Sequence, residues 1–273
     1  MSPMRSGGFL GRAFIGARML GVDVERAVST VRSLPRFARD AIAYWRAREE
    51  ADGFPLALRN IVPMLTDFAD QAGTASGDYF HQDLWAAKRV FAHRPVRHVD
   101  VGSRVDGLVS HLLCFMDVEV VDIRPLDSEV AGLRFVQDDA LSLAKFADES
   151  VPSLSCLHAL EHFGLGRYGD PIAPNGWRRG IDTLQRVLAP GGRLYFSVPI
   201  GREHLAFNAQ RVFAPSTILR SFTRLSLRSA SVVDESGRLC EDADPLDFED
   251  VRRACGLFEW ERALNSPADD AAK

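Results

Sequence analysis

A glycine-bounded turn between two valine-rich segments constrains the fold of this chain more than any other feature. The first segment suits a short buried strand because valines recur within residues 96–101. Residues 118–122 suit a second strand, which ends on Asp122. Between the two, leucines recur at helical spacing after the turn at residues 102–107. The order strand, turn, helix, strand predicts a βαβ unit.

The composition of this turn indicates a ligand. Glycine has no Cβ, so a ligand can approach the backbone at Gly102 and Gly107 closely, beside a helix N-terminus with unpaired N–H groups. Asp122 follows Gly102 by twenty residues, where nucleoside-binding folds place a carboxylate for the ribose diol. The sequence therefore predicts an adenosine site. Arg104 departs from the pattern G-x-G-x-x-G, so a plain βαβ crossover whose glycines serve only the turn stays open.

Composition narrows the class of protein. The 273 residues are 46% hydrophobic and 26% charged, as in ordinary globular domains. A net charge of −4 argues against a general nucleic-acid binder, which would be basic. The cysteines are scattered without a C-x-x-C pair, which favours free thiols in a reducing compartment and no disulfide. No apolar run is long enough to predict a transmembrane helix.

The first part of the chain is locally basic, and we expect a helical N-terminal extension over residues 1–78. Arginines recur through residues 1–53, interleaved with apolar side chains, so this segment could lie on an anionic membrane surface. Amphipathic helices most often bury their apolar stripe in protein, which favours packing on the main domain or on a partner. The helical pattern of residues 22–45 is expected in two pieces, separated at Pro35.

Residues 79–264 predict one α/β domain, because strand and helix patterns alternate along them. A helix over residues 79–91 begins with a polar cluster that we interpret as a helix cap and first-turn charge. Two late strands, residues 225–233 and 257–260, are expected to pair as a hairpin. The tail, residues 265–273, is expected to be disordered. The remaining predicted elements are strands at 134–137, 154–158 and 193–198, and helices at 176–188 and 215–222.

Several short motifs together resemble known families. In order, they are Asp-Val-Gly-Ser at 100–103, Asp122, Gln-Asp-Asp-Ala at 137–140, Leu-Glu-His at 160–162 and the Pro-Gly-Gly segment at 188–199. This order is similar to that of class I S-adenosylmethionine-dependent methyltransferases. More narrowly, residues 79–87, 98–107, 158–171 and 207–213 resemble DUF268, a family of uncharacterised bacterial and nematode proteins. The resemblance covers about residues 34–260 and implies a Rossmann-like class I methyltransferase fold: a seven-stranded, mostly parallel sheet with an antiparallel last strand.

The resemblance also implies the cofactor and the residues that hold it. S-adenosyl-L-methionine would place its methionine end at the turn after the first strand, its ribose at Asp122 and its adenine at the end of the third strand. Arg104 stands where most class I enzymes have a second glycine, so it would contact the cofactor carboxylate, redirect the loop or prevent binding. The cofactor-binding residues implied are Asp100, Gly102, Ser103, Arg104, Asp122, Asp139 and Ala140.

The end of the fourth strand is the expected catalytic position. His162 is a candidate general base, with Glu161 beside it, since an unperturbed histidine titrates near neutrality. A histidine that only orients the loop is the alternative. The spacing H-x-x-E-H at 158–162 is also a zinc-peptidase pattern, but glycines at 164 and 166 interrupt the helix that such a site needs, so we expect no metal. Candidates for holding the acceptor are Tyr168, Asp170, His204 and Asn208.

Three functions follow from these observations. The first is an S-adenosylmethionine-dependent methyltransferase acting on a small-molecule or sugar or cell-envelope precursor acceptor, in the cytoplasm or peripheral to the inner face of the membrane. The second is a non-catalytic methyltransferase-like binding protein, suggested by Arg104. The third is an NAD(P)-dependent oxidoreductase that uses the same βαβ unit, which the poor G-x-G-x-x-G match disfavours. The sequence does not identify the acceptor.

Overall fold

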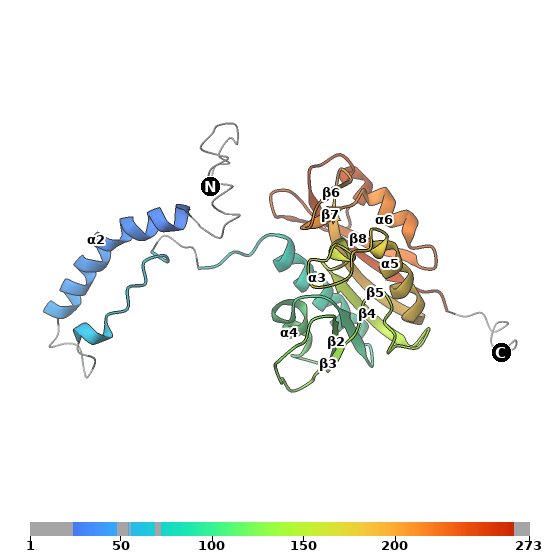
Figure 1. Cartoon of the computed structure of the whole chain (residues 1–273), viewed down its shortest axis with the longest axis horizontal. Coiled ribbons are helices and arrows are strands. Elements are labelled where there is room, and N and C mark those ends of the chain that lie inside the picture. The colour runs from blue at the N-terminus through green and yellow to red at the C-terminus, as the bar shows by residue number, and fades with distance from the viewer. Residues whose placement is uncertain (1–23, 48–53, 55, 69–71, 265–273) are drawn as a thin grey trace, which may run out of the picture. The chain divides into compact units, whose positions relative to one another are not determined.

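The computed structural model describes residues 24–47, 54, 56–68 and 72–264. The chain divides into two compact units, Met1–Thr74 and Ala75–Lys273, each of which is described by itself (Figure 1). The predicted tail, residues 265–273, and the residues before Val24 lie outside the described residues. None of the helices among the described residues is both long enough and apolar enough to cross a membrane.

The first unit contains α2 (Val24–Arg46) and the short 3-10 helix η2 (Leu58–Asn60). The prediction of two helical pieces separated at Pro35 was wrong, because α2 is one helix with Pro35 inside it. Proline removes one backbone donor, which a helix tolerates as a local kink when the turns on both sides continue.

The second unit is built on a sheet in the order β3-β2-β1-β4-β5-β10-β8-β9. Pairing is parallel from β3 through β5, while β10 runs antiparallel to both β5 and β8. The predicted fold, mostly parallel with an antiparallel last strand, is confirmed. The strands are β1 (His98–Val101), β2 (Val118–Asp122), β3 (Leu133–Gln137), β4 (Val151–Leu157), β5 (Leu188–Ile200), β8 (Ser226–Val233), β9 (Leu239–Cys240) and β10 (Ala254–Glu261).

Two details of the predicted sheet were wrong. The sheet has eight strands instead of seven, because the two-residue strand β9 pairs with the end of β8. The helix predicted over 176–188 ends at Val187, and β5 begins at once at Leu188, so the Pro-Gly-Gly segment lies within the strand. The register of β5 on β4 is irregular at this point, which lets the extra residues bulge out of the ladder.

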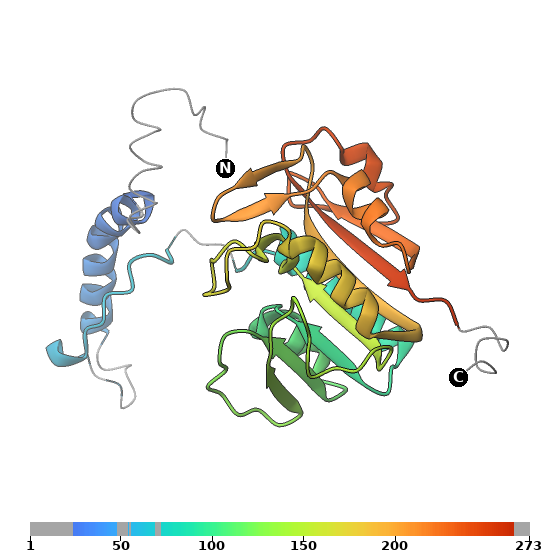
Figure 2. The ribbon, with the colours of Figure 1, turned by 45° about the vertical axis from the view of Figure 1, so that its right-hand side comes forward.

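Helices cover both faces of the sheet (Figure 2). On one face α3 (Asp78–His93) packs with η3 (Val105–Val109) and α4 (Ser110–Leu112), through a buried cluster that includes Trp85, Val90 and Leu112. On the other face α5 (Gly176–Val187) and α6 (Pro215–Ser221) contribute Ile181, Leu184 and Ile218 to the larger core, and Phe222 joins them directly after α6. Two 3-10 helices, η4 (Leu160–His162) and η5 (Pro245–Phe248), and a hairpin of β6 (His204–Ala206) and β7 (Gln210–Val212) complete the unit.

The carboxyl ends of β1, β2, β3 and β4 meet at one edge of this sheet, since the four strands are parallel neighbours. The hairpin of β6 and β7 lies over the segment that follows η4. Arg211 fixes it there, donating hydrogen bonds to the carbonyl oxygens of Phe163 at 2.8 Å and Pro174 at 3.3 Å. The sheet edge and the hairpin together frame the candidate site.

Candidate functional site

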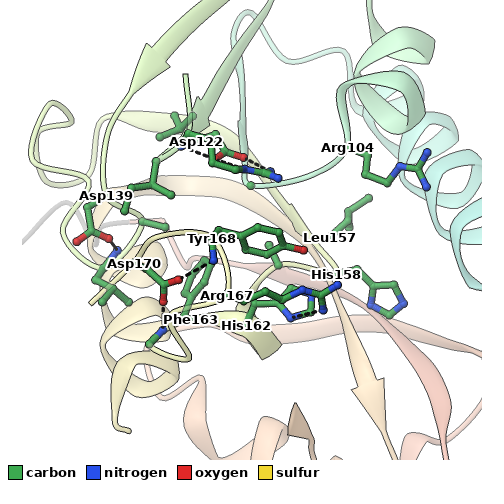
Figure 3. Close-up of a pocket in the computed structure, with 18 of the residues that line it drawn as sticks. Arg104, Asp122, Asp139, Leu157, His158, His162, Phe163, Arg167, Tyr168 and Asp170 are labelled. Carbon is green, nitrogen blue, oxygen red and sulfur yellow. Dashed lines mark hydrogen bonds and ion pairs between the residues drawn. The ribbon is translucent and has the colours of Figure 1, made fainter. Parts of the chain in front are cut away.

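A pocket opens at the carboxyl ends of β1 to β4 (Figure 3). Its wall contains Gly102 after β1, Asp122 at the end of β2, Asp139 after β3 and His162 after β4. The segment after η4 closes one side of the pocket, and Gln210 of β7 reaches its rim. In parallel sheets ligands bind at this edge, because the loops that leave the strands there splay apart.

The turn after β1 requires glycine at residue 102. Gly102 has φ +71°, a conformation that side chains rarely adopt, and its N–H donates to the carbonyl oxygen of Val121 at 2.8 Å. A Cβ at this position would lie 3.0 Å from the Cβ of Ala159. The bare backbone of residue 102 therefore forms part of the pocket wall, as the sequence predicted for a ligand-contacting turn.

Asp100 and Ser103 lie beneath this turn. The Asp100 carboxylate is fully buried and accepts hydrogen bonds from the Ser103 N–H at 3.2 Å, from the Ser103 hydroxyl at 2.7 Å and from the Ser155 hydroxyl. Burial raises the pKa of Asp100 to about 6, although these hydrogen bonds act to lower it. Neither residue is part of the pocket wall, so the geometry supports a role in holding the loop that carries Gly102.

Arg104 lies at the pocket but its side chain turns away from Asp122 and Tyr168 (Figure 3). Its guanidinium pairs with the carboxylate of Asp106 at 2.6 Å and lies over the ring of Tyr79 at 5.2 Å. In this arrangement the arginine that replaces the usual glycine occupies the outer surface of the turn and leaves the pocket beside Gly102 open.

Asp122 is held by the residue two places after it. Its carboxylate accepts from the Arg124 N–H at 2.8 Å and from the Arg124 guanidinium at 3.0 and 2.7 Å. The same guanidinium lies 4.4 Å from the centre of the Tyr168 ring. Burial acts to lower the pKa of Arg124, but its hydrogen bond to Asp122 has the larger effect and raises it. Asp122 thus lies at the pocket as a carboxylate paired with Arg124.

Asp139 and Ala140 also line the pocket, at the end of β3. One oxygen of the Asp139 carboxylate accepts from the N–H of Leu141 at 2.8 Å, which closes a tight turn at the strand end. The turn fixes the direction in which this carboxylate faces the cavity.

His162 is fixed by the hairpin opposite it. Its Nδ1 lies 2.8 Å from the carbonyl oxygen of Ala209, which can only accept, so Nδ1 carries the proton and the neutral ring keeps its electron pair on Nε2. Burial, more than any other cause, lowers the pKa of His162, and the nearby Arg167 guanidinium acts in the same direction. Glu161 partly opposes this, with Oε1 at 3.7 Å from Nε2. The arrangement suits a neutral proton acceptor.

The four predicted acceptor residues do not lie together. Tyr168 and Asp170 line the pocket, while His204 and Asn208 lie on the hairpin outside its wall. The Asp170 carboxylate accepts from the N–H groups of Gly164 at 2.9 Å, Gly166 at 3.2 Å and Tyr168 at 3.2 Å. Asp170 therefore organises the loop that presents Tyr168 to the cavity.

The structure adds pocket residues that the sequence analysis did not single out as functional. Tyr79 of the first turn of α3 lines the pocket, so the polar cluster at this helix start is more than a helix cap. His158, at the end of β4, and Arg167 line it too. The sequence held a signal for these residues, since they lie in the segments 79–87 and 158–171, which were expected to resemble DUF268.

Comparisons with known proteins agree with this picture for one segment. Residues 137–225 match the model of the family described as Caenorhabditis protein of unknown function, DUF268. No curated protein matches the sequence. The predicted resemblance to DUF268 is confirmed over the matched segment, which runs from the end of β3 past α6 and includes Asp139, His162 and Tyr168.

Among solved structures, the chain is similar to the N1-methyltransferase of 1,6-didemethyltoxoflavin from Burkholderia thailandensis, with 14% identity, TM-score 0.49 and coverage of 85% of this chain and 90% of that one. It is also similar to the N-methyltransferase NodS from Bradyrhizobium japonicum WM9, with 14% identity, TM-score 0.47 and coverage of 80% and 97%. The [4+2]-cyclase SpnF matches at 15% identity and TM-score 0.49, with coverage of 66% and 82%.

The mostly parallel sheet and the antiparallel β10 are the features that the resemblance implied for the fold. The segment that matches the DUF268 model therefore lies within an α/β domain whose sheet has the form expected of the class I methyltransferase-like fold.

Proposed function

We propose that this protein is an S-adenosylmethionine-dependent methyltransferase that acts on a small-molecule acceptor. The observation that carries the proposal is that the glycine turn, the Asp122 carboxylate and the His162 imidazole share one pocket. A cofactor fits the residues present, because Gly102 leaves backbone exposed where a side chain would fill the cavity and Asp122 offers acceptor oxygens to hydroxyl groups.

Residues of three strand ends would hold the cofactor. Gly102 and the loop that Asp100 and Ser103 hold would take the methionine end, Asp122 the ribose hydroxyls, and Asp139 with Ala140 the adenine edge. Arg104 lines the pocket and is the candidate for the cofactor carboxylate, because a planar guanidinium suits that group; binding there would exchange the Asp106 carboxylate for that of the cofactor. When bound, the cofactor supplies an activated methyl group, so the protein has to align the acceptor and remove its proton.

His162 is the group proposed to remove that proton. Its Nε2 carries the electron pair. The Ala209 carbonyl orients the ring, while burial and the Arg167 guanidinium keep it neutral. The pKa of His162 is lowered below 6.5, so the base is present at neutral pH and is lost as pH falls through the lowered value. We expect His162→Gln to reduce turnover about a hundredfold or more with cofactor binding unchanged.

Titration calorimetry with S-adenosylhomocysteine tests the cofactor. A hydrogen bond to a charged group contributes about 1.5 to 3 kcal/mol, so Asp122→Asn is expected to weaken binding about tenfold to 150-fold. Asp127→Asn, an exposed acid in the following loop, is the matched control and should bind as the wild type does. If the wild type binds neither S-adenosylhomocysteine nor S-adenosylmethionine, the proposal fails and the alternative of a non-catalytic protein takes its place. Binding of NADH in preference to both would favour the oxidoreductase.

For the acceptor, we propose a sugar or cell-envelope precursor. Support comes from the half-exposed Tyr168 ring, whose flat face can pack on a sugar ring, with polar Asp170 and Gln210 close by in the pocket wall. A screen of nucleotide sugars against amino acids and aromatic amines, measured by release of S-adenosylhomocysteine, tests this. Activity confined to the amines would contradict the acceptor class and leave the methyltransferase proposal standing.

We also propose that the N-terminal segment holds the protein at the inner, cytoplasmic face of an anionic membrane. Along α2, Val31, Leu34, Ile42 and Trp45 fall on one face at helical spacing, and the helix has five arginines against Glu25 and Asp40. Co-sedimentation of the full-length protein with phosphatidylserine vesicles tests this, with Ile42→Ser/Trp45→Ser expected to lose binding. Equal sedimentation of both proteins would contradict it.

A further inference from the structure

A buried cluster beside the pocket contains polar atoms whose hydrogen bonding is incomplete. The side chains of His158 and Glu161 are each only 2% exposed. Neither ring nitrogen of His158 nor the Oε2 atom of Glu161 makes a hydrogen bond of good geometry among the described residues, although two carboxylates lie within 3.6 Å of the ring. Proteins satisfy nearly all buried polar atoms, so three such atoms in one place need an explanation, and a role at the neighbouring site is one.

Four elements build this cluster. His158 follows β4 with φ +47°, which turns its side chain away from the centre of the pocket (Figure 3). Its Nε2 lies 3.6 Å from Asp78 at the start of α3, and its Nδ1 lies 3.2 Å from Glu161 of η4. The ring of Tyr79 packs edge-on at 5.2 Å. The charged and titratable groups that face His158 are thus Asp78, Tyr79, Glu161 and Cys255 of β10.

One oxygen of the Glu161 carboxylate lies close to both His158 and His162. Glu161 Oε1 lies 3.2 Å from Nδ1 of His158 and 3.7 Å from Nε2 of His162. His158 is therefore the closer partner. The other groups that face His162 are Arg167, whose guanidinium lies 3.4 Å from Nδ1, and the Tyr168 ring, at 5.4 Å between ring centres.

The two imidazoles have opposite electrostatic environments. Burial acts to lower the pKa of His158, but Cys255, Glu161 and Asp78 together raise it well above 6.5. Because burial raises the pKa of the Cys255 thiol, we assign the counter-charge to the two carboxylates. The pKa of His162 is lowered, first by burial. When the pKa values of two histidines are shifted in opposite directions, one can act as a cation and the other as a base.

We propose that His158 is a positioning residue: as a buried cation it holds the Glu161 carboxylate on its own side of the cluster and so leaves Nε2 of His162 free to accept the acceptor's proton. The use of that proton acceptor rests on the proposed function. When His162 accepts, its electron pair forms the new N–H bond, and the electrons of the broken bond stay on the acceptor atom as its nucleophile. Glu161, 3.7 Å away, then offsets the charge that His162 gains.

Because Glu161 lies between the two histidines, replacing His158 and replacing Glu161 should shift the pKa of His162 in opposite directions. Without His158, the carboxylate is released toward His162 and the repulsion from a neighbouring cation is lost. Both changes favour the protonated form of His162, so its pKa rises in His158→Gln. Removing the carboxylate itself in Glu161→Gln has the opposite effect and lowers it. A purely structural role for His158 would move neither value in this pattern.

The experiment is a pH titration of full-length protein with ¹⁵N-labelled histidine, followed by two-bond ¹H–¹⁵N spectra, which report the protonation of each ring nitrogen. Spectra of His162→Gln and His158→Gln assign the two residues. The variants are His158→Gln, Glu161→Gln and His158→Lys, which restores a cation. His81→Gln is the matched control, because its ring contacts Phe80 instead of the cluster.

In the wild type we expect His158 to carry protons on both nitrogens at neutral pH and His162 to carry one, on Nδ1. The midpoint of His162 should rise in His158→Gln, fall in Glu161→Gln, and return toward the wild-type value in His158→Lys. An unchanged or lower midpoint in His158→Gln overturns the proposal. If His158→Gln does not fold, two other results overturn the proposal equally. One is a neutral His158 in the wild type, and the other is a higher His162 midpoint in Glu161→Gln. None of these readouts depends on cofactor binding, so failure of the proposed function would be seen separately by calorimetry.

Discussion

The Asp122 carboxylate and the Arg124 guanidinium form a two-pronged pair, with Nε at 3.0 Å from Oδ1 and Nη2 at 2.7 Å from Oδ2. The Arg124 backbone N–H occupies Oδ1 as well, at 2.8 Å. A carboxylate that accepts three hydrogen bonds keeps about one of its roughly four acceptor positions, on Oδ2, whereas a ribose diol presents two hydroxyl groups. A ligand that uses Asp122 therefore competes with Arg124.

This competition predicts that Arg124→Met increases the affinity for S-adenosylhomocysteine. The variant keeps the length of the side chain and removes both guanidinium hydrogen bonds, which leaves only the backbone N–H on Oδ1. Binding then no longer has to replace a hydrogen bond of about 1 kcal/mol, and we expect about a fivefold gain. Calorimetry measures it, with Arg134→Met, an exposed arginine of β3, as the control. A weaker affinity in Arg124→Met would instead mean that Arg124 orients the carboxylate for the ligand.

Tyr168 is expected to hold its loop over the pocket through its ring. Arg124 lies at 4.4 Å and Arg167 at 5.2 Å from the ring centre. Each such contact is worth about 0.5 to 1 kcal/mol at an exposed site, so Tyr168→Ala should increase opening of the loop about fivefold to thirtyfold. Tyr168→Phe keeps the ring and should behave as the wild type. Limited proteolysis within residues 164–169 measures the opening, and equal cleavage of all three proteins would rule the contacts out as the cause.

The buried Asp100 carboxyl group is expected to make the stability of the folded protein depend on pH. Its pKa is raised from 3.8 to about 6 in the folded protein, chiefly by burial, so the folded state holds a proton that the unfolded state has released between these values. Folding stability contributed by this group therefore falls as pH rises from about 4 to above 6, by about 3 kcal/mol, and stays at the lower level beyond.

Asp100→Asn does not titrate and should lack this fall. Urea unfolding of both proteins between about pH 4 and about pH 7 measures it, and the difference in unfolding free energy should change by about 3 kcal/mol in favour of the variant. Any constant offset from altered hydrogen bonds to Ser103 and Ser155 cancels in that comparison. Parallel curves for the two proteins would show that Asp100 titrates alike in the folded and unfolded states.

Gly107 is expected to be required because of Asp83 on α3. A Cβ at Gly107 would lie 2.3 Å from Oδ2 and 3.0 Å from Cγ of this nearly buried side chain. We expect Gly107→Ala to destabilise the protein by about 1 to 3 kcal/mol in thermal or urea unfolding. Asp83→Ala should relieve the overlap, so the double variant should be more stable than the sum of the two single changes allows. If the two changes in unfolding free energy simply add, the cost of Gly107→Ala does not come from overlap with Asp83.

The sequence determined the elements of the βαβ unit because their signals are local. Valine spacing in residues 96–101 and 118–122 predicted β1 and β2, and the pattern of residues 79–91 predicted α3. Gly102 was identified as a turn, and its φ of +71° explains why glycine stands there. Local sequence patterns predicted less well those segments whose structure depends on pairing with neighbouring strands. The Pro-Gly-Gly segment has the composition of a turn but lies within β5, since the pairing of Leu188 with Val151 of β4 extends that strand past the segment.

The composition of the site was decided by tertiary structure. Asp122, Asp139 and His162 come from strand ends far apart in the sequence, and their proximity was predictable only as a consequence of a parallel sheet. The fold gives residues with the same side chain different surroundings. Asp100 lies buried under the loop while Asp122 faces the pocket. His158 has two carboxylate neighbours, while His162 faces a carbonyl and a guanidinium. The sequence by itself determined which chemical groups follow each strand, because strand and turn preferences are local. Only the fold decided which of them are charged and which reach the pocket, because burial and neighbouring charges depend on segments distant in the chain.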